Sequence, residues 1–457
     1  MPVFPPNSLL IRRARVLLPD GELEIADVQI QQGKIAQVGA EISESADQII
    51  EAEGLTLLPG VIDPQVHFRE PGLEHKEDLF TASCACAKGG VTSFLEMPNT
   101  RPLTTTQAAL DDKLQRASQK CLVNYGFFIG ATAENLPDLH QATPTPGIKI
   151  FMGSMHGALL VDQEAALEAI FAAGVREASA RQARLIAVHA EDQSRILERR
   201  RQFEGSTDPA VHSQIQDNQA ALLATQLALR LSHQYQRRLH ILHLSTAEEA
   251  ELLRQDKPSW VTAEVTPQHL LLNTDAYEKI GTLAQMNPPL RSHHDNQVLW
   301  QALLDGVIDF IATDHAPHTL AEKAQGYPNT PSGMPGVETS LPLMLTQAMQ
   351  GRCTVAQVAR WMSTAVAQGY GIPRKGAIAP GYDADLVLVD LQTYRPVLRE
   401  KLLTKCGWSP FEGWNLTGWP VITIVNGQVV YNRGKLNTAV RGKALTFDAD
   451  SATVNPT

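Results

Sequence analysis

The sequence predicts an α/β fold: a closed (β/α)8 barrel of the TIM type, with a small β-sandwich domain built from both chain termini. Three observations predict it. Apolar, strand-like runs alternate with helical patterns through the centre of the chain. Each end of the chain contains short strands separated by turn residues. Polar residues suited to chemistry follow several central strands, and a barrel would gather them at one mouth.

The central alternation predicts the barrel. The expected strands cover residues 57–62, 91–97, 123–129, 148–152, 185–188, 239–244, 260–265 and 308–312. The expected helices cover 78–88, 107–120, 163–180, 217–232, 247–255 and 295–304. Near-continuous apolar strands indicate a parallel sheet that helices cover. A closed barrel is the economical arrangement, and a doubly wound open sheet is the alternative.

Short strands at both ends predict the second domain. Strand-like runs lie at 9–11, 16–18, 27–30 and 35–38 near the start, and at 385–390 and 421–431 near the end. The last run contains Asn426-Gly427, a typical hairpin turn. We expect residues 1–57 and 370–457 to form the small domain, and residues 58–369 to form the barrel that carries the activity.

The composition narrows the function classes. Hydrophobic residues make up 43% of the 457 residues, charged residues make up 19%, and the net charge is -10. This balance argues against a nucleic-acid partner and leaves a small molecule as the expected ligand. No apolar run reaches the roughly twenty residues of a membrane span, and no signal peptide is visible. The five cysteines are an odd number without metal-finger spacing, as in a reduced, cytoplasmic protein.

Residues that can bind metals follow five of the expected strands. Asp63, Gln65 and His67 follow the first strand and are joined by Arg69. Alternation along an extended chain directs Gln65, His67 and Arg69 to the same side. The other strands contribute Lys149, His189, His243 and Asp314.

Each of these residues also has an ordinary structural role open to it. A single histidine at a strand end is usually a satisfied polar residue, Lys149 could extend to water, and Asp314 could cap the following segment. His240 and His243 lie three residues apart on a strand, so only one of them can face the mouth. Five strands that each supply a nitrogen or oxygen donor at one level favour a shared site.

The donor set predicts zinc. Imidazoles with a carboxylate suit Zn²⁺, and catalytic zinc keeps one position open for water. Lys149 could join such a site only as a neutral amine that CO₂ converts to a carbamate, which has two oxygens and can bridge two ions. Burial in an apolar strand favours the neutral amine that this reaction needs.

Several motifs resemble those of the amidohydrolase superfamily and, within it, of the dihydroorotases. The motifs are Asp63-Pro-Gln-Val-His-Phe-Arg-Glu-Pro-Gly72, Met97-Pro-Asn-Thr100, His189-Ala-Glu191, His243-Leu-Ser245, Asn287-Pro-Pro-Leu-Arg291, Thr313-Asp-His-Ala-Pro-His318 and Pro380-Gly-Tyr-Asp-Ala-Asp385. They extend over most of the chain. The resemblance implies a (β/α)8 barrel with a terminal β-domain. It also implies reversible, metal-dependent cyclisation of N-carbamoyl-L-aspartate to L-dihydroorotate in de novo pyrimidine biosynthesis.

The resemblance also implies a role for each site residue. One zinc ion would be held by His67, Lys149 and Asp314, and a second by carboxylated Lys149, His189 and His243. Asp314 would also act as the general base, taking a proton from water and returning it to the ring nitrogen. The substrate-binding residues it implies are Arg69, Asn99 and His318 for the carboxylate, and Asn287, Ser332 and Gly333 for the ring amide.

One residue departs from the family pattern. The family usually has His-x-His after the first strand, whereas this chain has Gln65-Val66-His67. An amide oxygen is a poorer zinc ligand than an imidazole. Either Gln65 coordinates weakly, or the first ion has fewer protein ligands.

The sequence leaves two other functions open. The first is another cyclic amidohydrolase, such as a dihydropyrimidinase, hydantoinase or allantoinase. The second is a non-catalytic partner of aspartate carbamoyltransferase, for which Gln65 is the only support. The resemblance allows a homodimer and an association with that transcarbamoylase. The Gly- and Pro-rich segment 318–340 is a candidate for a loop that covers the substrate.

Overall fold

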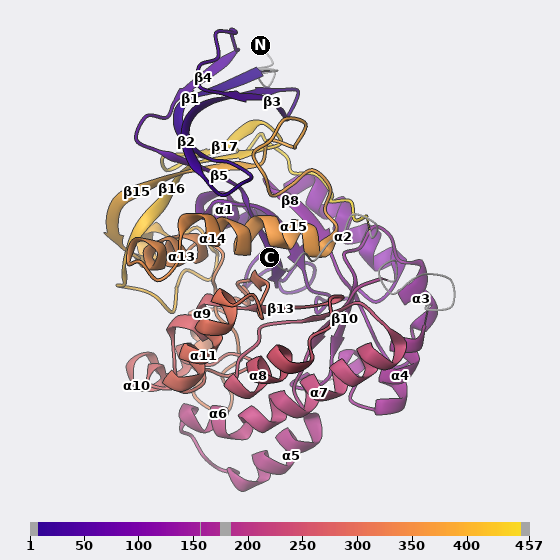
Figure 1. Cartoon of the computed structure of the whole chain (residues 1–457). Coiled ribbons are helices and arrows are strands. Elements are labelled where there is room, and N and C mark those ends of the chain that lie inside the picture. The colour runs from indigo at the N-terminus through magenta and orange to yellow at the C-terminus, as the bar shows by residue number, and fades with distance from the viewer. Residues whose placement is uncertain (1–7, 156, 174–183, 449–457) are drawn as a thin grey trace.

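The computed structural model describes residues 8–155, 157–173 and 184–448. A β-rich domain made from both ends of the chain lies against a barrel with helices outside it (Figure 1). Both parts of the predicted fold class are therefore present. No helix in the described part of the chain is long and apolar enough to cross a membrane.

The two ends of the chain form one sheet. Its order is β18-β17-β16-β15-β5-β1-β2-β3, and β4 pairs with β1. Antiparallel pairing of β15 with β5 joins the two halves, with Leu388 opposite Leu57. The strands are β1 (Ser8–Leu17), β2 (Leu23–Gln31), β3 (Lys34–Gly39), β4 (Gln48–Glu51), β5 (Thr56–Pro59), β15 (Leu386–Pro396), β16 (Asn415–Val425), β17 (Gln428–Asn432) and β18 (Lys435–Leu436).

The central strands are parallel and form a closed barrel. They pair in the orders β6-β7-β8 and β14-β13-β12-β11-β10-β9. The chain runs from β8 through Phe128 into β9, and His67 N–H donates to the His315 carbonyl (2.7 Å), which links the ends of β6 and β14. The barrel strands are β6 (Val61–Val66), β7 (Val91–Glu96), β8 (Asn124–Phe127), β9 (Ile129–Gly130), β10 (Ile148–Phe151), β11 (Ile186–His189), β12 (Leu239–Ile241), β13 (Val261–Val265) and β14 (Phe310–Ile311).

Helices cover the outer face of the barrel, as α4, α7 and α8 do in Figure 1. The α-helices are α1 (Leu79–Gly89), α2 (Gln107–Lys120), α3 (Leu136–Gln141), α4 (Glu164–Ala172), α5 (Gln193–Gln202), α6 (His212–Ile215), α7 (Asn218–Tyr235), α8 (Ala247–Asp256), α9 (Pro267–Leu271), α10 (Ala276–Ile280), α11 (His293–Leu304), α12 (Leu320–Lys323), α13 (Ser340–Met349), α14 (Val355–Ala359) and α15 (Ala365–Tyr370). Of the helix expected over 163–180, residues 174–180 lie outside the described residues.

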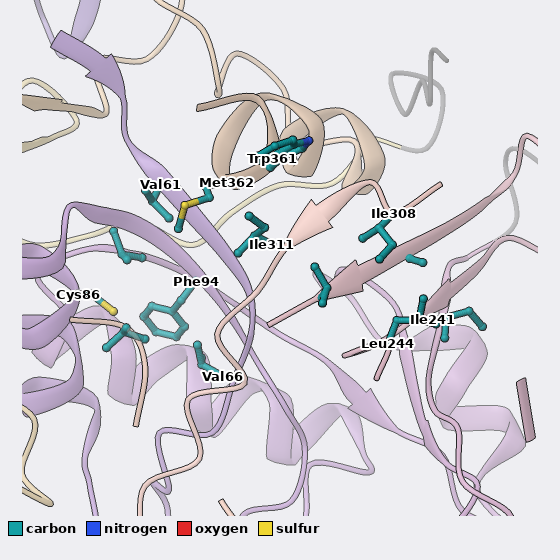
Figure 2. Packing of buried hydrophobic residues seen from close by; sticks show 14 of the residues in the cluster. Val61, Val66, Cys86, Phe94, Ile241, Leu244, Ile308, Ile311, Trp361 and Met362 are labelled. Atoms are coloured by element: carbon teal, nitrogen blue, oxygen red, sulfur yellow. The ribbon is translucent and has the colours of Figure 1, made fainter. Parts of the chain in front are cut away.

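Aliphatic and aromatic side chains of the strands pack the core between strands and helices. Figure 2 shows Val61 and Val66 of β6, Ile241 of β12 and Ile311 of β14 in the same buried cluster. Trp361 and Met362, from the π-helical turn between α14 and α15, belong to that cluster too. This packing fixes the relative positions of the strand ends, where the candidate site lies.

Two boundaries differ from the expected ones. The strand expected at 57–62 is two strands, because β5 pairs in the terminal sheet up to Pro59 and β6 begins in the barrel at Val61. At the end of the chain, the segment after β18 returns to the barrel instead of staying in the terminal domain. Tyr125 N–H donates to the Lys443 carbonyl (3.1 Å), and Leu445 N–H donates to the Tyr125 carbonyl (2.8 Å).

Candidate active site

Asp314, just past β14, is the meeting point of two side chains from β6 and its end. The Gln65 Nε2 amide donates to Asp314 Oδ1 (3.2 Å), and His67 Nε2 lies 3.1 Å from the same oxygen. All three side chains are buried. The alternation expected along the first strand therefore does direct Gln65 and His67 to one side.

His189 and His243 form a second group of donors. His189 Nδ1 lies 2.9 Å from His243 Nε2, and His189 Nε2 lies 2.7 Å from the Glu191 carboxylate. The Glu191 contact places a proton on His189 Nε2, because a carboxylate only accepts hydrogen bonds. His189 Nδ1 faces His243. Burial lowers the pKa of His243 well below its usual value, so the His243 ring is neutral.

Lys149, in β10, lies within the electrostatic reach of both groups. Its side chain is fully buried, and its Nζ has no hydrogen-bond partner among the described residues. Burial lowers its pKa to about 7, while Asp314 and Glu264 act in the opposite direction. The charge of Lys149 in turn helps to lower the pKa of His243. A neutral amine is therefore accessible at this position near neutral pH.

The backbone at these strand ends is strained. Three of the predicted site residues have positive φ angles although none is a glycine: Arg69 (68°), His243 (35°) and Asp314 (45°). Such a conformation costs on the order of 1 kcal/mol for each residue, and it persists only where surrounding contacts hold it. The fold thus keeps these side chains in position at a cost in stability.

The donor atoms beside Asp314 leave a gap in the hydrogen bonding that a cation would fill. His67 Nδ1 lies 2.7 Å from Asn99 Oδ1 and donates to it, so the lone pair of His67 Nε2 faces the Asp314 carboxylate. Two acceptor atoms that face each other in a buried site need a cation or a proton between them. Lys149 Nζ and His243 Nδ1 are also buried and have no hydrogen-bond partner among the described residues.

The histidine and aspartate donors of the site occur in two pairs. No group of three or more His, Cys, Asp and Glu side chains among the described residues is placed to hold a metal ion. Each group has two such donors, His67 with Asp314 and His189 with His243. A further donor would have to be of another residue type, and the buried Lys149 Nζ and Gln65 Oε1 are two such atoms without a hydrogen-bond partner among the described residues.

Gln65 occupies the position where the resemblance leads one to expect a histidine. Its Nε2 is used on Asp314, while its Oε1 is buried and has no hydrogen-bond partner in the described part of the chain. The oxygen is therefore the only atom of this amide that could reach a cation. Whether it does stays a prediction.

Buried polar side chains hold together the strands that carry the donors. Asp63 accepts hydrogen bonds from Thr313 N–H (3.1 Å) and Thr313 Oγ1 (2.6 Å), which ties β6 to the end of β14. Burial raises the pKa of Asp63 to about 7. His240, which the sequence set against His243, turns away and lies 3.0 Å from Glu264.

A cationic corner lies beside Asp314. The buried Arg69 donates through Nε to the Pro317 carbonyl (3.0 Å), and its guanidinium lies 3.2 Å from His318 Nε2. Within the described residues, Arg69 makes no ion pair with a carboxylate. His318 Nδ1 lies 3.0 Å from Lys76 Nζ, and its Nε2 lies 3.0 Å from the Ser332 carbonyl. Burial and the neighbouring cations hold the pKa of His318 well below its usual value.

The residues expected to meet the ring amide form the facing wall. His212 Nε2 lies 2.8 Å from Asn287 Oδ1 and 3.1 Å from the Met286 carbonyl, so this nitrogen carries the proton and donates. Asn287 Oδ1 is thereby occupied, and its amide N–H groups are the ones left for a ligand. Gly333 has φ 142°, and a Cβ there would collide with the Ala316 carbonyl, so only glycine fits.

The structure thus brings the predicted residues together in small groups, Gln65 and His67 with Asp314, His189 with His243, and Arg69 with His318, and it shows further neighbours that the sequence reading missed. Asn99, expected to bind substrate, contacts His67 directly. The missed residues are Lys76, Glu191, His212, Gln285 and Lys323. Glu191 lies inside a quoted motif and could have been found there. The others contact partners far along the chain, often backbone atoms, which no residue pattern encodes.

The chain is similar to proteins of the amidohydrolase family. Residues 56–430 match the family model described as "Amidohydrolase family". A curated protein named dihydroorotase from Methanosarcina acetivorans is 36% identical over 92% of this chain and 91% of its own length. A protein of the same name from Anoxybacillus flavithermus is 32% identical over 94% of this chain and 99% of its own length.

Solved structures of related enzymes have the same fold. An L-hydantoinase (dihydropyrimidinase) from Arthrobacter aurescens superposes with a TM-score of 0.90 at 31% identity, covering 96% of this chain and 99% of its own. A dihydropyrimidinase from Brevibacillus agri gives a TM-score of 0.88 at 27% identity, covering 98% of this chain and 100% of its own.

Proposed function

The chain belongs to the amidohydrolase family, and we propose that it is a dihydroorotase, which interconverts N-carbamoyl-L-aspartate and L-dihydroorotate. This is the activity named for its curated relatives, and it makes the chain a cyclic amide hydrolase. Its place would be de novo pyrimidine biosynthesis in the cytoplasm, and its ligand a small acidic ring.

The observation that carries the proposal is the cationic corner at Arg69. A buried guanidinium without a carboxylate partner among the described residues is costly unless an anion joins it. A planar guanidinium suits a carboxylate, whereas the nearby Lys76 is already paired with Glu322 (2.9 Å). L-Dihydroorotate carries such a carboxylate, whereas the rings of hydantoin and dihydrouracil do not.

The metal site would comprise Lys149 as a carbamate, His67 and Asp314 on one side, and His189 and His243 on the other. Gln65 Oε1 would be an additional weak ligand. When bound, two divalent cations, which we propose to be Zn²⁺, would polarise the scissile carbonyl and make water acidic enough to react near neutral pH. Glu191 would orient the His189 ring through the Nε2 contact.

Asp314 would move the proton in the reaction. Its Oδ1 accepts from Gln65 and faces His67 Nε2, which leaves Oδ2 to accept a proton during ring opening and return it during closure. Asn287 would donate to a ring carbonyl, since His212 occupies its oxygen. Ser332 and Gly333 would bind the amide edge with their backbone.

A hydantoinase or dihydropyrimidinase is the second candidate, favoured by the close superposition on enzymes of those names. The two activities differ in their need for a carboxylate on the substrate. Allantoinase activity belongs to the same alternative. A non-catalytic partner of aspartate carbamoyltransferase is the third reading, with an unmodified Lys149 and no metal.

The experiment is metal analysis of the purified chain together with assays on L-dihydroorotate, N-carbamoyl-L-aspartate, hydantoin, dihydrouracil and allantoin. We expect about two metal ions per chain and turnover of the first two compounds. Turnover of hydantoin or dihydrouracil at a comparable kcat/KM would favour the second candidate. A chain without metal or activity, but bound to aspartate carbamoyltransferase in gel filtration, would favour the third. The same column would test the proposed homodimer.

A further inference from the structure

Lys323, the last residue of α12, has an unusual environment. Its side chain is almost fully buried, yet in the described part of the chain it pairs with no carboxylate. Its Nζ instead donates to three backbone carbonyls: those of Gln285 (3.0 Å), Pro331 (2.9 Å) and Gly333 (3.3 Å). An ammonium group has three N–H donors, so this set of acceptors matches it in number.

The main chain of the same residue extends the network. The Lys323 carbonyl accepts from Thr282 Oγ1 (2.7 Å) and from Thr330 Oγ1 (3.1 Å). Lys323 thus connects two separate segments, because its Nζ and its backbone carbonyl each bond to residues of 282–285 and of 330–333. The first segment is mostly a short 3-10 helix, Gly281–Ala284, and residues 330–333 belong to no helix or strand.

These two segments lead directly to the wall of the site. Asn287 follows the first, and Ser332 and Gly333 belong to the second. Gln285 joins the segments as well, since its Nε2 donates to Ser332 Oγ (3.2 Å) and its carbonyl accepts from Gly333 N–H (3.0 Å). The positions of the proposed amide-binding groups therefore depend on contacts that converge on Lys323.

We propose that Lys323 is a positioning residue that holds the 330–333 segment against the barrel mouth, so that Ser332 and Gly333 meet the substrate. The inference rests on the proposed function for the identity of that substrate, but the contacts that carry it are independent of it. Lys323 touches no metal ligand. Its effect on the reaction would be exerted on substrate binding through the segment it holds.

The charge of Lys323 makes this hold dependent on pH. Burial lowers its pKa to about 7. A neutral amine has only two N–H donors, so above this pH one of the three carbonyls loses its partner. The groups that face Lys323 are the neutral His318 and the Trp408 ring, whose centroid is 5.8 Å from Nζ. The adjacent Glu322 is already paired with Lys76 (2.9 Å).

The test uses three variants. Lys323→Met keeps the length of the side chain and removes its donors, Lys323→Arg keeps a charge that does not titrate, and Lys279→Met makes the same change at an exposed site on α10. We expect Lys323→Met to raise KM for L-dihydroorotate about tenfold or more, the effect of one ordinary hydrogen bond, with kcat within about threefold. Lys323→Arg should have a KM close to that of the wild type, and Lys279→Met should behave as wild type.

Two further readouts keep the outcome decisive. Wild-type KM should rise as pH increases through about 7, and this rise should be absent in Lys323→Arg. Hydrogen exchange of residues 326–336 should be faster in Lys323→Met than in Lys279→Met, whether or not dihydroorotate is the substrate. Unchanged exchange in Lys323→Met would overturn the inference. If Met does not fold, a KM–pH profile shared by wild type and Arg would overturn it, and failure of dihydroorotate turnover alone would overturn only the proposed function.

Discussion

Replacing Arg69 with glutamine tests the carboxylate corner most directly. The change removes the charge and keeps one amide N–H that can still donate to the Pro317 carbonyl, as Arg69 Nε does (3.0 Å). A further nitrogen of the guanidinium faces His318. What remains for a substrate carboxylate is about one or two charge-assisted hydrogen bonds.

The size of the effect follows from that count. A hydrogen bond to a charged group contributes about 1.5–3 kcal/mol. One or two of them correspond to about 1.5–6 kcal/mol, or a fall in kcat/KM for L-dihydroorotate of roughly 10-fold to 25,000-fold. The folded protein should lose no stability, because burial already lowers the pKa of Arg69 from 12.5 to about 10 and the unpaired charge is costly.

The assay compares kcat/KM of Arg69→Gln and wild type for L-dihydroorotate, with thermal unfolding of both. Arg201→Gln, at an exposed position on α5, is the matched control. The reasoning is refuted if Arg69→Gln keeps activity within about threefold of wild type. It is equally refuted if any residual turnover of hydantoin, which has no carboxylate, falls by the same factor.

Three further predictions concern the residues around the donors. Gln65→His should bind Zn²⁺ about tenfold tighter or more in a chelator competition, because imidazole is the better ligand; equal affinity would mean that residue 65 points away from the ion. Asp63→Asn should remove a pH dependence of stability. The folded pKa is raised from 3.8 to about 7, so wild-type stability is highest below about 4 and falls as pH rises to about 7. The free energy of unfolding, measured with urea at pH 5 and pH 8, tests this. The same change between the two pH values in wild type and Asp63→Asn would contradict it. His212→Ala should raise KM about tenfold with little change in kcat, because Asn287 Oδ1 loses its donor (2.8 Å) and the Asn287 amide can rotate. An unchanged KM would show that His212 does not position Asn287.

The barrel and most of its site could be predicted because both depend on local patterns. Buried parallel strands are apolar along their whole length, and the residue that ends each strand lies at the same mouth. His189 and Asp314 could therefore be placed from strand positions alone. The family resemblance supplied the roles of these residues, and the alternation in β6 supplied the common direction of Gln65 and His67.

The parts that the sequence reading missed depend on contacts between distant segments. Lys323 looks like an ordinary charged residue near the end of a short helix, and only the fold surrounds it with carbonyls. The division between β5 and β6 was missed because residues 57–62 read as one apolar run, although Pro59 has no N–H with which to continue a ladder. The return of the chain beside Tyr125 involves only a few residues, too few for a periodic pattern.

Three buried groups without a hydrogen-bond partner among the described residues belong to the candidate site: Lys149 Nζ, His243 Nδ1 and Gln65 Oε1. Other such groups, for example Gln29 Nε2 in β2, lie elsewhere in the fold. Arg69 is a buried charge at the same site. Each costs on the order of 1–3 kcal/mol as long as no ligand joins it. Cations would satisfy the lone pairs and an anionic ring would satisfy the guanidinium, so the same ligands that the chemistry needs would remove the cost. Arg69, His243 and Asp314 also have positive φ angles at these strand ends, which is expected where a fold gives up stability for a binding site.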